Sequence, residues 1–376
     1  MSMIVNLSRE ELLASLASLQ NVTGKKGTIA ILSNVLIETG NDAVHITGTD
    51  LEVGVRSQVA AEVRTEGKIT LPSKKLFEIV RESDAQHLSM EVRDNNWVQI
   101  KVGSSDYNLA GMPAEEFPSF PDYDEEAMVP LPAELLKDLI DKTYFSIAQE
   151  GESQFNLTGV LVQKEEEEDG SSVLKMISSD GHRLSLMEEE VETGLGELLA
   201  RGAIIPRKGV QEMRKLAEGN EIVAVGFEEK QAVLKTEETI MIIRLMNGDF
   251  PDYKGILSSI GRERRLSIER VPFLNSMKRM NLFTEDRYNA VKFHIEKERL
   301  ILSSQSMDIG NAKDELPVKY DGESIELGFN GRYFVDVLQV LESNTVQISI
   351  NSEESPCLIE AEEDPGFLSV IMPMKL

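Results

Sequence analysis

A self-similarity with a period near 130 residues constrains the fold of this sequence more than any other feature. The tetrapeptide FPDY stands at 120–123 and again at 250–253. Helix-like patterns repeat at a similar spacing, so the periodicity does not depend on four residues alone. Self-similarity over such a distance is typical of chains in which neighbouring units bury a shared surface.

Six stretches are predicted to be amphipathic helices, because apolar residues recur in them at three- and four-residue spacing. They form two interleaved series, 8–20, 132–145 and 271–283 in the first and 71–83, 205–219 and 329–343 in the second. Ser8 is the expected N-cap of the first helix. The second series starts near Ser73, Arg207 and Gly331, which are 134 and 124 positions apart.

Between the helices, short runs of alternating apolar and polar residues are broken by turn residues, which is typical of antiparallel strands. Such runs at 34–57, 159–187 and 290–310 follow the helices of the first series. A further pair of strands follows each helix of the second series. Each unit is therefore predicted to contain helix, hairpin, helix, hairpins and a proline-bearing exit. The predicted fold class is α+β, with three similar domains at 1–125, 126–254 and 255–376.

The composition is that of a folded protein of two or three domains, with 376 residues, 41% apolar and 28% charged. The sequence opens without a leader pattern, and no apolar run approaches the ~18 residues of a membrane span, so a cytoplasmic protein without membrane contact is expected. The single cysteine, Cys357, excludes an internal disulfide and a metal site built from several cysteines. No cofactor and no metal are expected, since the sequence lacks a Gly-rich phosphate loop and a metal-binding motif.

The formal net charge of −26 would by itself argue against a polyanionic partner. The helical windows nevertheless hold 15 Lys and Arg against 11 Asp and Glu, whereas the rest of the chain holds 24 against 54. These windows are 8–26, 72–83, 132–147, 206–218, 271–284 and 330–343. One interpretation is that Lys and Arg are simply good helix formers. The other is that all six helices face one polyanion, with an acidic outer surface screened over a Debye length of ~8 Å.

Helix packing limits how such a chain could surround DNA. Six helices packed side by side at ~10 Å would close a circle with ~9 Å of open space, and twelve would leave ~28 Å. The major groove of DNA alone is ~12 Å wide. A ring around a duplex therefore requires two copies of the chain.

Four motifs occur together in the order of one known family. They are SDGHRL at 179–184, PRKGV at 206–210, GDFPDY at 248–253 and MPMKL at 372–376. With the three units, they make the whole chain resemble the bacterial DNA polymerase III beta subunit, the DNA sliding clamp. The resemblance implies the DNA-clamp fold, with helices lining a central hole and antiparallel sheets outside. It also implies a non-enzymatic processivity factor for DNA replication, a ring-shaped homodimer that encircles duplex DNA without sequence preference. Its implied partners are the DNA polymerase III catalytic subunit, the clamp loader and other clamp-binding peptides.

The resemblance further implies a partner-peptide cleft between the second and third domains. It would comprise Leu157, Ser179, Gly181, His182, Arg183, Leu184, Pro251, Ile256, Val370, Met372, Pro373, Met374 and Leu376. An apolar cleft with a few polar edges suits a short peptide, and methionines repack easily around several partners. The alternative for the final segment is an ordinary strand with buried methionines. Ser179, Gly255 and Lys375 stand where the family often has threonine, arginine and arginine, and the missing bulk at Gly255 is expected to widen one wall and change peptide preference.

Two more sets of residues are expected from the charge pattern and the resemblance. The DNA-facing candidates are Lys25, Lys26, Lys74, Lys75, Arg207, Lys208, Arg214 and Lys215. The resemblance implies a dimer interface in which the strand near Tyr107 and Leu109 of one subunit meets the helix end at Leu282 and Phe283 of the other. The basic cluster at 262–265 is assigned no role.

Two alternatives belong to other classes of protein. His182 next to Asp180 could be the general base of a hydrolase or transferase, but no nucleophile motif accompanies it and Asp-Gly is a turn signal. The second alternative is a monomeric acidic scaffold that never meets DNA. Such a monomer could not form the wider hole.

Overall fold

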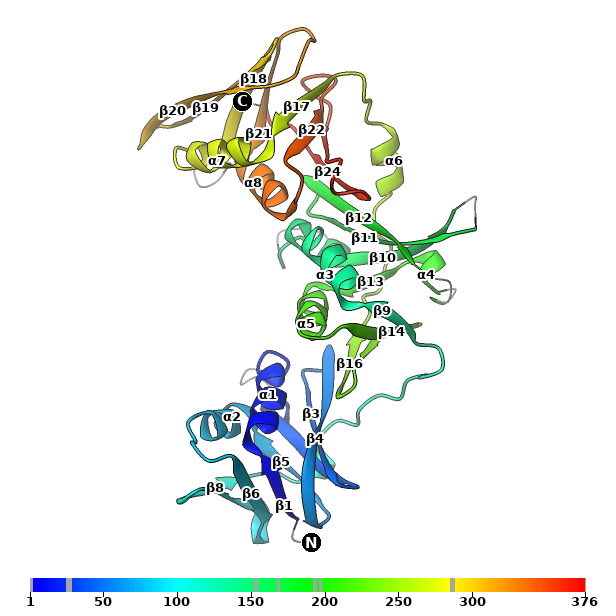
Figure 1. Cartoon of the computed structure of the whole chain (residues 1–376), viewed down its shortest axis with the longest axis vertical. Coiled ribbons are helices and arrows are strands. Elements are labelled where there is room, and N and C mark those ends of the chain that lie inside the picture. The colour runs from blue at the N-terminus through cyan, green and yellow to red at the C-terminus, as the bar shows by residue number, and fades with distance from the viewer. Residues whose placement is uncertain are drawn as a thin grey trace. The chain divides into compact units, whose positions relative to one another are not determined.

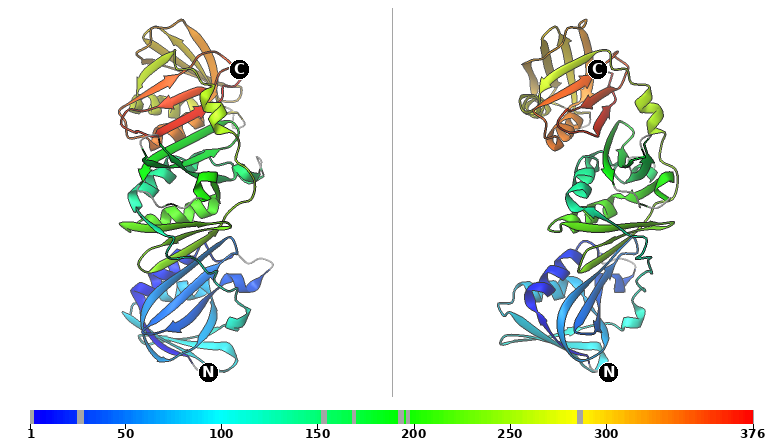
Figure 2. Two further views of the ribbon diagram at one scale, coloured as in Figure 1. Left: turned by 90° about the vertical axis from the view of Figure 1, so that its right-hand side faces the viewer. Right: turned by 45° about the vertical axis from the view of Figure 1, so that its right-hand side comes forward.

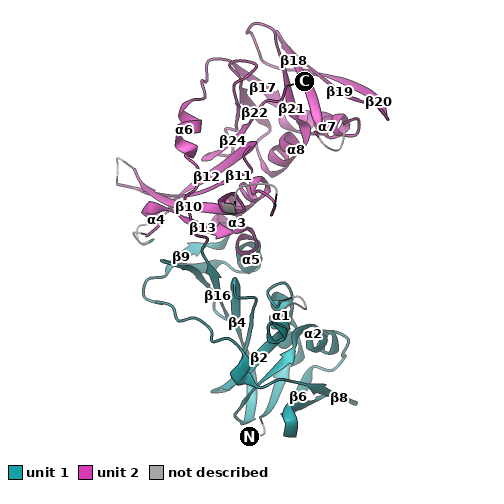
Figure 3. Cartoon of the chain, turned by 180° about the vertical axis from the view of Figure 1, so that it is seen from behind, with its two compact units in different colours: residues 1–133, 194–196, 211–245 teal, residues 134–193, 197–210, 246–376 magenta. Residues whose placement is uncertain are grey.

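The computed structural model describes residues 3–24, 29–151, 155–167, 170–191, 195, 198–284 and 288–375. Its contacts divide the chain into two compact units (Figure 3). Unit 1 comprises 1–133, 194–196 and 211–245, and unit 2 comprises 134–193, 197–210 and 246–376. Both units combine helices with antiparallel sheets, which confirms the predicted α+β class.

Unit 1 contains a 12-stranded antiparallel sheet (Figure 1). Its main path runs β8-β7-β6-β1-β4-β16-β15-β14-β9, and β3, β2 and β5 extend from β4. The long β4 joins the parts of this sheet, because its C-terminal end pairs with β1 and its N-terminal end with β16. The strands are β1 (Ile4–Ser8), β2 (Asn34–Gly40), β3 (Ala43–Thr49), β4 (Val53–Thr65), β5 (Lys68–Pro72), β6 (His87–Val92), β7 (Trp97–Val102), β8 (Ser105–Ala110), β9 (Val129–Pro132), β14 (Ile222–Glu228), β15 (Gln231–Lys235) and β16 (Thr239–Arg244).

Helices α1 (Arg9–Leu19) and α2 (Ser73–Arg81) pack against each other and against strands of this sheet (Figure 2). The predicted N-cap of α1 is confirmed: the Glu11 N–H donates to Ser8 Oγ at 3.5 Å. Leu12 and Leu16 on the inner face of α1 are fully buried. The 3.6-residue periodicity thus identified the face that the sheet covers.

Unit 2 contains an 8-stranded antiparallel sheet in the order β13-β10-β11-β12-β24-β23-β22-β17 and a 4-stranded sheet in the order β20-β19-β18-β21. The strands are β10 (Gly159–Glu166), β11 (Ser172–Ser179), β12 (Arg183–Val191), β13 (Ala203–Pro206), β17 (Arg265–Glu269), β18 (Ala290–Glu296), β19 (Arg299–Ser306), β20 (Gly310–Pro317), β21 (Ile325–Asn330), β22 (Thr345–Ser349), β23 (Cys357–Glu360) and β24 (Phe367–Ile371). The helices are α3 (Ala133–Asp141), α4 (Leu198–Arg201), α6 (Tyr253–Ser258), α7 (Arg270–Asn281) and α8 (Gly331–Val340). Helix α5 (Arg207–Ala217) is shared by both units.

Four phenylalanines form the centre of one core in unit 2. Phe273 on α7, Phe293 on β18, Phe329 on β21 and Phe334 on α8 are fully buried. Their ring centroids lie 4.9–6.2 Å apart, mostly in edge-to-face contact. Such aromatic pairs add stability beyond their buried area, so this cluster fixes α7 and α8 on the 4-stranded sheet.

The repeat is finer than the sequence period indicates. Within the described part of the chain, the order strand, helix and three strands occurs six times, beginning at β1, β5, β9, β13, β17 and β21. The short strand before each helix, and one strand after each helix of the second series, were not predicted from the sequence. These leading strands have only four to six residues, which is too short for a clear period-two pattern beside a helix.

Candidate partner-binding site

The SDGHR motif forms a hydrogen-bonded turn between β11 and β12. Ser179 Oγ accepts the Gly181 N–H at 3.1 Å and donates to the Arg183 carbonyl at 2.7 Å. Asp180 Oδ1 accepts the N–H groups of His182 and Arg183 at 2.9 and 3.0 Å. Gly181 has a φ of +88°, a left-handed conformation that glycine adopts without strain. The polar side chains of the motif therefore hold its own backbone.

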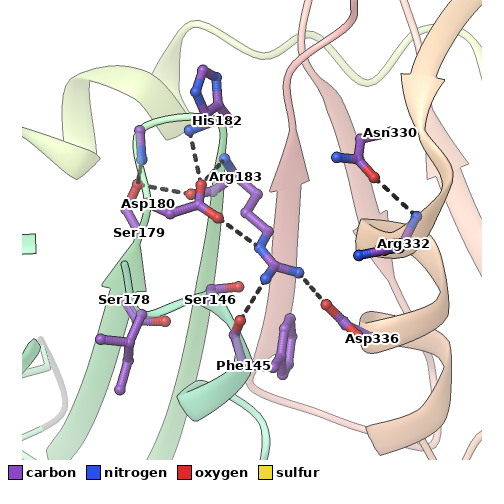
Figure 4. A network of polar contacts seen from close by, with 12 residues as sticks. Phe145, Ser146, Ser178, Ser179, Asp180, His182, Arg183, Asn330, Arg332 and Asp336 are labelled. Carbon is purple, nitrogen blue, oxygen red and sulfur yellow. Dashed lines mark hydrogen bonds and ion pairs between the residues drawn. The ribbon is translucent and has the colours of Figure 1, made fainter. Parts of the chain in front are cut away.

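The Arg183 side chain joins this turn to α8 (Figure 4). Its Nε donates to Asp180 Oδ2 at 3.0 Å, and its two terminal nitrogens donate to Asp336 Oδ2 and to the Phe145 carbonyl, both at 2.6 Å. The guanidinium lies 4.3 Å from the centroid of the Tyr333 ring. With its side chain only 10% exposed, Arg183 acts as an anchor between two elements of unit 2.

The partners of this anchor were not predicted from the sequence. Asp336 is 153 positions from Arg183 in the sequence, and an aspartate on an amphipathic helix gives no signal of such a pairing. Burial, followed by the nearby Asp180 carboxylate, raises the pKa of the Tyr333 hydroxyl. Tyr333 therefore stays neutral beside the ion pair and serves as a flat support for the guanidinium.

The C-terminal segment is attached to the turn by backbone hydrogen bonds. Strand β24 pairs with β12 so that Val370 lies opposite Leu184. The Met372 N–H then donates to the His182 carbonyl at 2.9 Å, and the Met374 N–H donates to the Gly328 carbonyl at 2.7 Å. The final segment is therefore held at two points, while the Met372 side chain stays 41% exposed.

An apolar cluster lies beneath this segment and α6. We define it by its buried members and by four half-buried residues packed on them. The members are Leu161, Ile177, Leu184, Leu186, Ile204, Tyr253, Ile260, Leu358 and Val370, with Met246, Phe250, Leu257 and Leu368 packed against them. It joins β10, β11, β12, β24 and α6, the last of which lies beside the ends of these strands in Figure 2. The second FPDY copy contributes its aromatic residues to this cluster.

Helix α6 is held over the cluster by its first turn. Asp252 Oδ1 accepts the Gly255 N–H at 3.0 Å. A Cβ at Gly255 would lie 2.6 Å from the other oxygen of Asp252, so a larger residue would displace this cap. The Tyr253 hydroxyl donates to Gln163 Oε1 at 2.8 Å. Burial, and then the Glu165 carboxylate, raise the pKa of Tyr253 to about 12, which keeps it a donor.

The predicted cleft residues differ in exposure. Leu157, Leu184 and Val370 are buried, Ser179, Arg183, Pro251, Pro373 and Met374 are half-buried, and Gly181, His182, Ile256 and Met372 are exposed. Leu184 and Val370 meet in the apolar cluster, whereas Leu157 lies outside it and accepts the Ala148 N–H at 3.0 Å. Leu376 lies outside the described residues. Two of the predicted cleft residues, Ile256 on α6 and Met372 after β24, are thus large apolar side chains exposed to solvent.

Asp180 is not paired with the ring of His182. It contacts His182 through the backbone N–H and directs its other oxygen to Arg183. In the described part of the chain no hydrogen bond reaches the exposed ring of His182. Across these same residues there is no group of three or more His, Cys, Asp or Glu placed to bind a metal ion. Nor does any described helix have the length and apolarity to cross a membrane.

The DNA-facing candidates in unit 1 lie on helix surfaces. Lys74 and Lys75 are exposed in the first turn of α2, where Lys75 Nζ lies 2.6 Å from a Glu78 oxygen. Arg214 and Lys215 lie in the last turn of α5, where Lys215 pairs with Glu212 of the same helix and Arg214 with Glu218 just beyond its end. Lys25 and Lys26 lie outside the described residues.

The candidates in unit 2 are less exposed. The Arg207 guanidinium donates to the Ile147 carbonyl at 2.8 Å and lies 4.7 Å from the centroid of the Tyr144 ring. Lys208 is half-buried. The Arg207 head group is therefore already engaged within its own unit.

The residues expected at a dimer interface lie beside free sheet edges. Tyr107 and Leu109 are half-buried on β8, the terminal strand of the 12-stranded sheet. Leu282 follows α7 and is 69% exposed, and Phe283 beside it is half-buried. Helix α7 packs on β20, the terminal strand of the 4-stranded sheet.

Three family models match successive parts of the chain. They are the N-terminal, central and C-terminal domains of the DNA polymerase III beta subunit, matched at residues 3–121, 130–252 and 261–375. Two similar proteins are the beta sliding clamps of Chlamydia pneumoniae and Haemophilus influenzae, both 32% identical to this chain. The alignments cover 98% of both chains in the first case and 99% of both in the second.

Solved structures agree with these matches. The DNA polymerase sliding clamp of Caulobacter crescentus and the sliding clamp of Bartonella birtlesii bound to griselimycin both have TM-scores of 0.93 and 30% identity, with all of each chain covered. The likeness extends over three clamp domains with antiparallel sheets. The chain therefore belongs to the family of bacterial DNA polymerase III beta subunits, the beta sliding clamps, which are not enzymes.

Proposed function

We propose that this chain is a replicative processivity factor. Two copies close a ring around duplex DNA, and each copy tethers DNA polymerase III by a peptide bound above the apolar cluster of unit 2. The observation that carries the tether is the exposure of Ile256 and Met372, which adjoin members of the apolar cluster in the sequence: Ile256 precedes Leu257, and Met372 follows Val370 by two residues. Exposed apolar groups beside a few polar edges are what a short peptide with aliphatic or aromatic anchors requires. The clamp loader and other partners would use the same surface.

The domain limits proposed for this function are 1–125, 126–254 and 255–376. Each domain then contains two copies of the strand, helix and three-strand order. A ring of two copies presents twelve helices to its centre, and only a ring of that size has room for a duplex.

The proposed ring contact joins β8 of one copy to the α7 and β20 region of the other. Unpaired strand edges are ready to pair with a second chain. Leu282 is 69% exposed at the end of α7, which packs on the edge strand β20. Tyr107 and Leu109 lie on the other edge strand, β8. Two identical heterologous contacts of this kind close a ring.

Weak attachment to DNA suits a tether that must slide. Retention then comes from closure of the ring, so few phosphate contacts are needed. Lys74 and Lys75, exposed at the start of α2, are proposed to make such contacts. The ion pair of Lys75 with Glu78 weakens the electrostatic attraction of Lys75 to phosphate.

Deletion of residues 374–376 tests the peptide site, and the Leu282→Asp substitution tests the ring contact. The deletion removes the Met374 attachment to Gly328 and should abolish stimulation of polymerase while light scattering still reports a dimer. Leu282→Asp should give monomers. A deleted protein that stimulates polymerase as well as the intact chain would reject the assignment of the site.

A further inference from the structure

Unit 1 contains a second copy of the turn described above, between β3 and β4. Thr49 Oγ1 accepts the Leu51 N–H at 2.9 Å and donates to the Val53 carbonyl at 3.0 Å. Asp50 Oδ1 accepts the N–H groups of Glu52 and Val53 at 3.0 and 2.8 Å. These are the same four hydrogen bonds that the SDGHR motif makes in unit 2.

The pairing beyond the turn is duplicated as well. The Arg244 N–H donates to the Glu52 carbonyl at 2.8 Å, as the Met372 N–H does to the His182 carbonyl at 2.9 Å. Strand β4 pairs with β16 in the register in which β12 pairs with β24. In this comparison Arg244 takes the place of Met372, and Gly54 takes the place of Leu184. The two FPDY segments, 120–123 and 250–253, accompany the two copies.

Gly54 of the unit 1 copy stands where the unit 2 copy has Leu184, and the missing side chain leaves space there. A cavity of about 280 Å³ is lined there by Leu51, Gly54, Phe120 and Ile242, among others. The guanidinium of Arg56 lies 4.5 Å from the centroid of the Phe120 ring and covers one face of it. The volume is close to the ~300 Å³ lower limit of ligand pockets, so it suits one large side chain rather than an extended small molecule.

Two cations stand at the rim of this cavity. Lys230 and Arg244 line it together with one half-buried acidic residue, Glu52, so cations outnumber carboxylates in the lining. Both cations are exposed, and neither forms an ion pair with an acidic side chain among the residues described. Leu51, also at the rim, is 51% exposed and has a φ of +76° where the other copy has glycine. A leucine in the left-handed region is strained, and such strain is concentrated at functional sites.

We propose that this cavity is a second peptide site, which takes an extended segment of a partner protein with one aliphatic or aromatic side chain next to an acidic residue. The apolar side chain fills the space over Gly54, and the carboxylate lies between Lys230 and Arg244. The unit 2 copy has Met372 in the place of Arg244 and His182 in the place of Glu52, so the two sites select different peptides. One chain can then hold two partners at once, which goes beyond the single polymerase tether proposed above.

Methyl NMR of the full-length protein tests this site directly. The probe is the acetylated, amidated tetrapeptide Gly-Asp-Phe-Gly, compared with its Asn counterpart and with N-acetylphenylalanine. We expect saturable shifts of the Leu51 and Ile242 methyl groups, with the Asn peptide bound roughly fivefold more weakly because one exposed charge contact is lost. Shifts confined to Ile256 and Met372 would overturn the proposal. Equal affinity for N-acetylphenylalanine would overturn the assignment to a peptide.

Two variants separate the cavity from its charges. Gly54→Leu restores the residue of the other copy, and a Cβ there has ordinary contact with Phe120 at 3.5 Å. It should remove the peptide-induced shifts of Leu51 and Ile242. The Met372 methyl signal should be the same in the variant and in the unchanged chain.

Arg244→Glu should weaken the Asp peptide roughly tenfold and the Asn peptide much less. Lys101→Glu, an exposed residue on β7, makes the same charge change away from the cavity and should alter neither. Because Arg244 is exposed, its variant decides the question even if Gly54→Leu fails to fold. Binding that survives both changes would contradict the proposal.

Discussion

Replacing Asp336 by alanine removes one of the three polar partners that hold the Arg183 guanidinium. The lost contact is a charged hydrogen bond of 2.6 Å between β12 and α8. Hydrogen bonds to charged groups contribute about 1.5–3 kcal/mol. Because the Asp336 side chain is 36% exposed, solvent screening reduces this value. We expect a coupling free energy of about 1–2 kcal/mol between the two residues.

A double-mutant cycle measures this coupling, with Arg183→Met, Asp336→Ala and the combined variant. The chain has several domains, so hydrogen exchange of the α8 amides reports the local free energy of opening better than one global transition. Glu323→Ala is the matched control, since its pair with Arg264 is 3.4 Å long and Glu323 is 87% exposed. That change should cost less than about 0.5 kcal/mol. A coupling below about 0.3 kcal/mol for Arg183 and Asp336 would refute the view that they anchor the turn.

Three further predictions concern the stability of unit 2. Burial raises the pKa of Asp364, but hydrogen bonds from the Ser343 and Glu342 N–H groups and from Lys142 outweigh it and hold the pKa below 3.8. The stabilisation that the Asp364 carboxylate contributes to the fold is therefore complete above pH 3.8 and is lost as the pH falls through the lower pKa of the folded state. Thermal melting at several acidic pH values should show the melting temperature falling with pH. Asp364→Asn should make that dependence weaker. Gly366→Ala should destabilise strongly, because φ is +79° and the new Cβ would lie 2.1 Å from the Glu188 carbonyl oxygen. Gly181→Ala, with φ +88° and open space, should cost only about 1–2 kcal/mol in the same melting assay; equal losses would contradict the steric argument. Burial raises the pKa of the Cys357 thiol, so iodoacetamide should label it only after unfolding, and rapid labelling of the folded chain at pH 8 would show that β23 opens.

Much of the fold could be predicted because its helices are amphipathic and its units repeat. The helix series and the FPDY copies were recognised from sequence spacing, and Ser8 was correctly identified as a cap. The strands that lead into each helix were not, since a four-residue strand such as β13 (Ala203–Pro206) gives too little alternation. The sixfold repeat of strand, helix and three strands became visible only in the order of the elements in the structure.

The candidate site divides in the same way. The turn of the SDGHR motif is local, so Asp180 and Gly181 could be assigned to a turn from the sequence. Asp336 and Tyr333 could not be found, because their partnership with Arg183 exists only after β12 and α8 pack together. The likeness between the Thr49 and Ser179 turns was also missed, since their side chains differ while their hydrogen bonds agree.

Retention on circular and linear DNA tests the central claim, that the ring holds DNA by enclosing it. Clamps loaded on a nicked circle should remain bound when the salt concentration is raised, and they should leave once a single cut makes the DNA linear. The cut changes no contact between protein and DNA, so it isolates the contribution of closure. Equal retention on the circle and on the linear product would contradict the account.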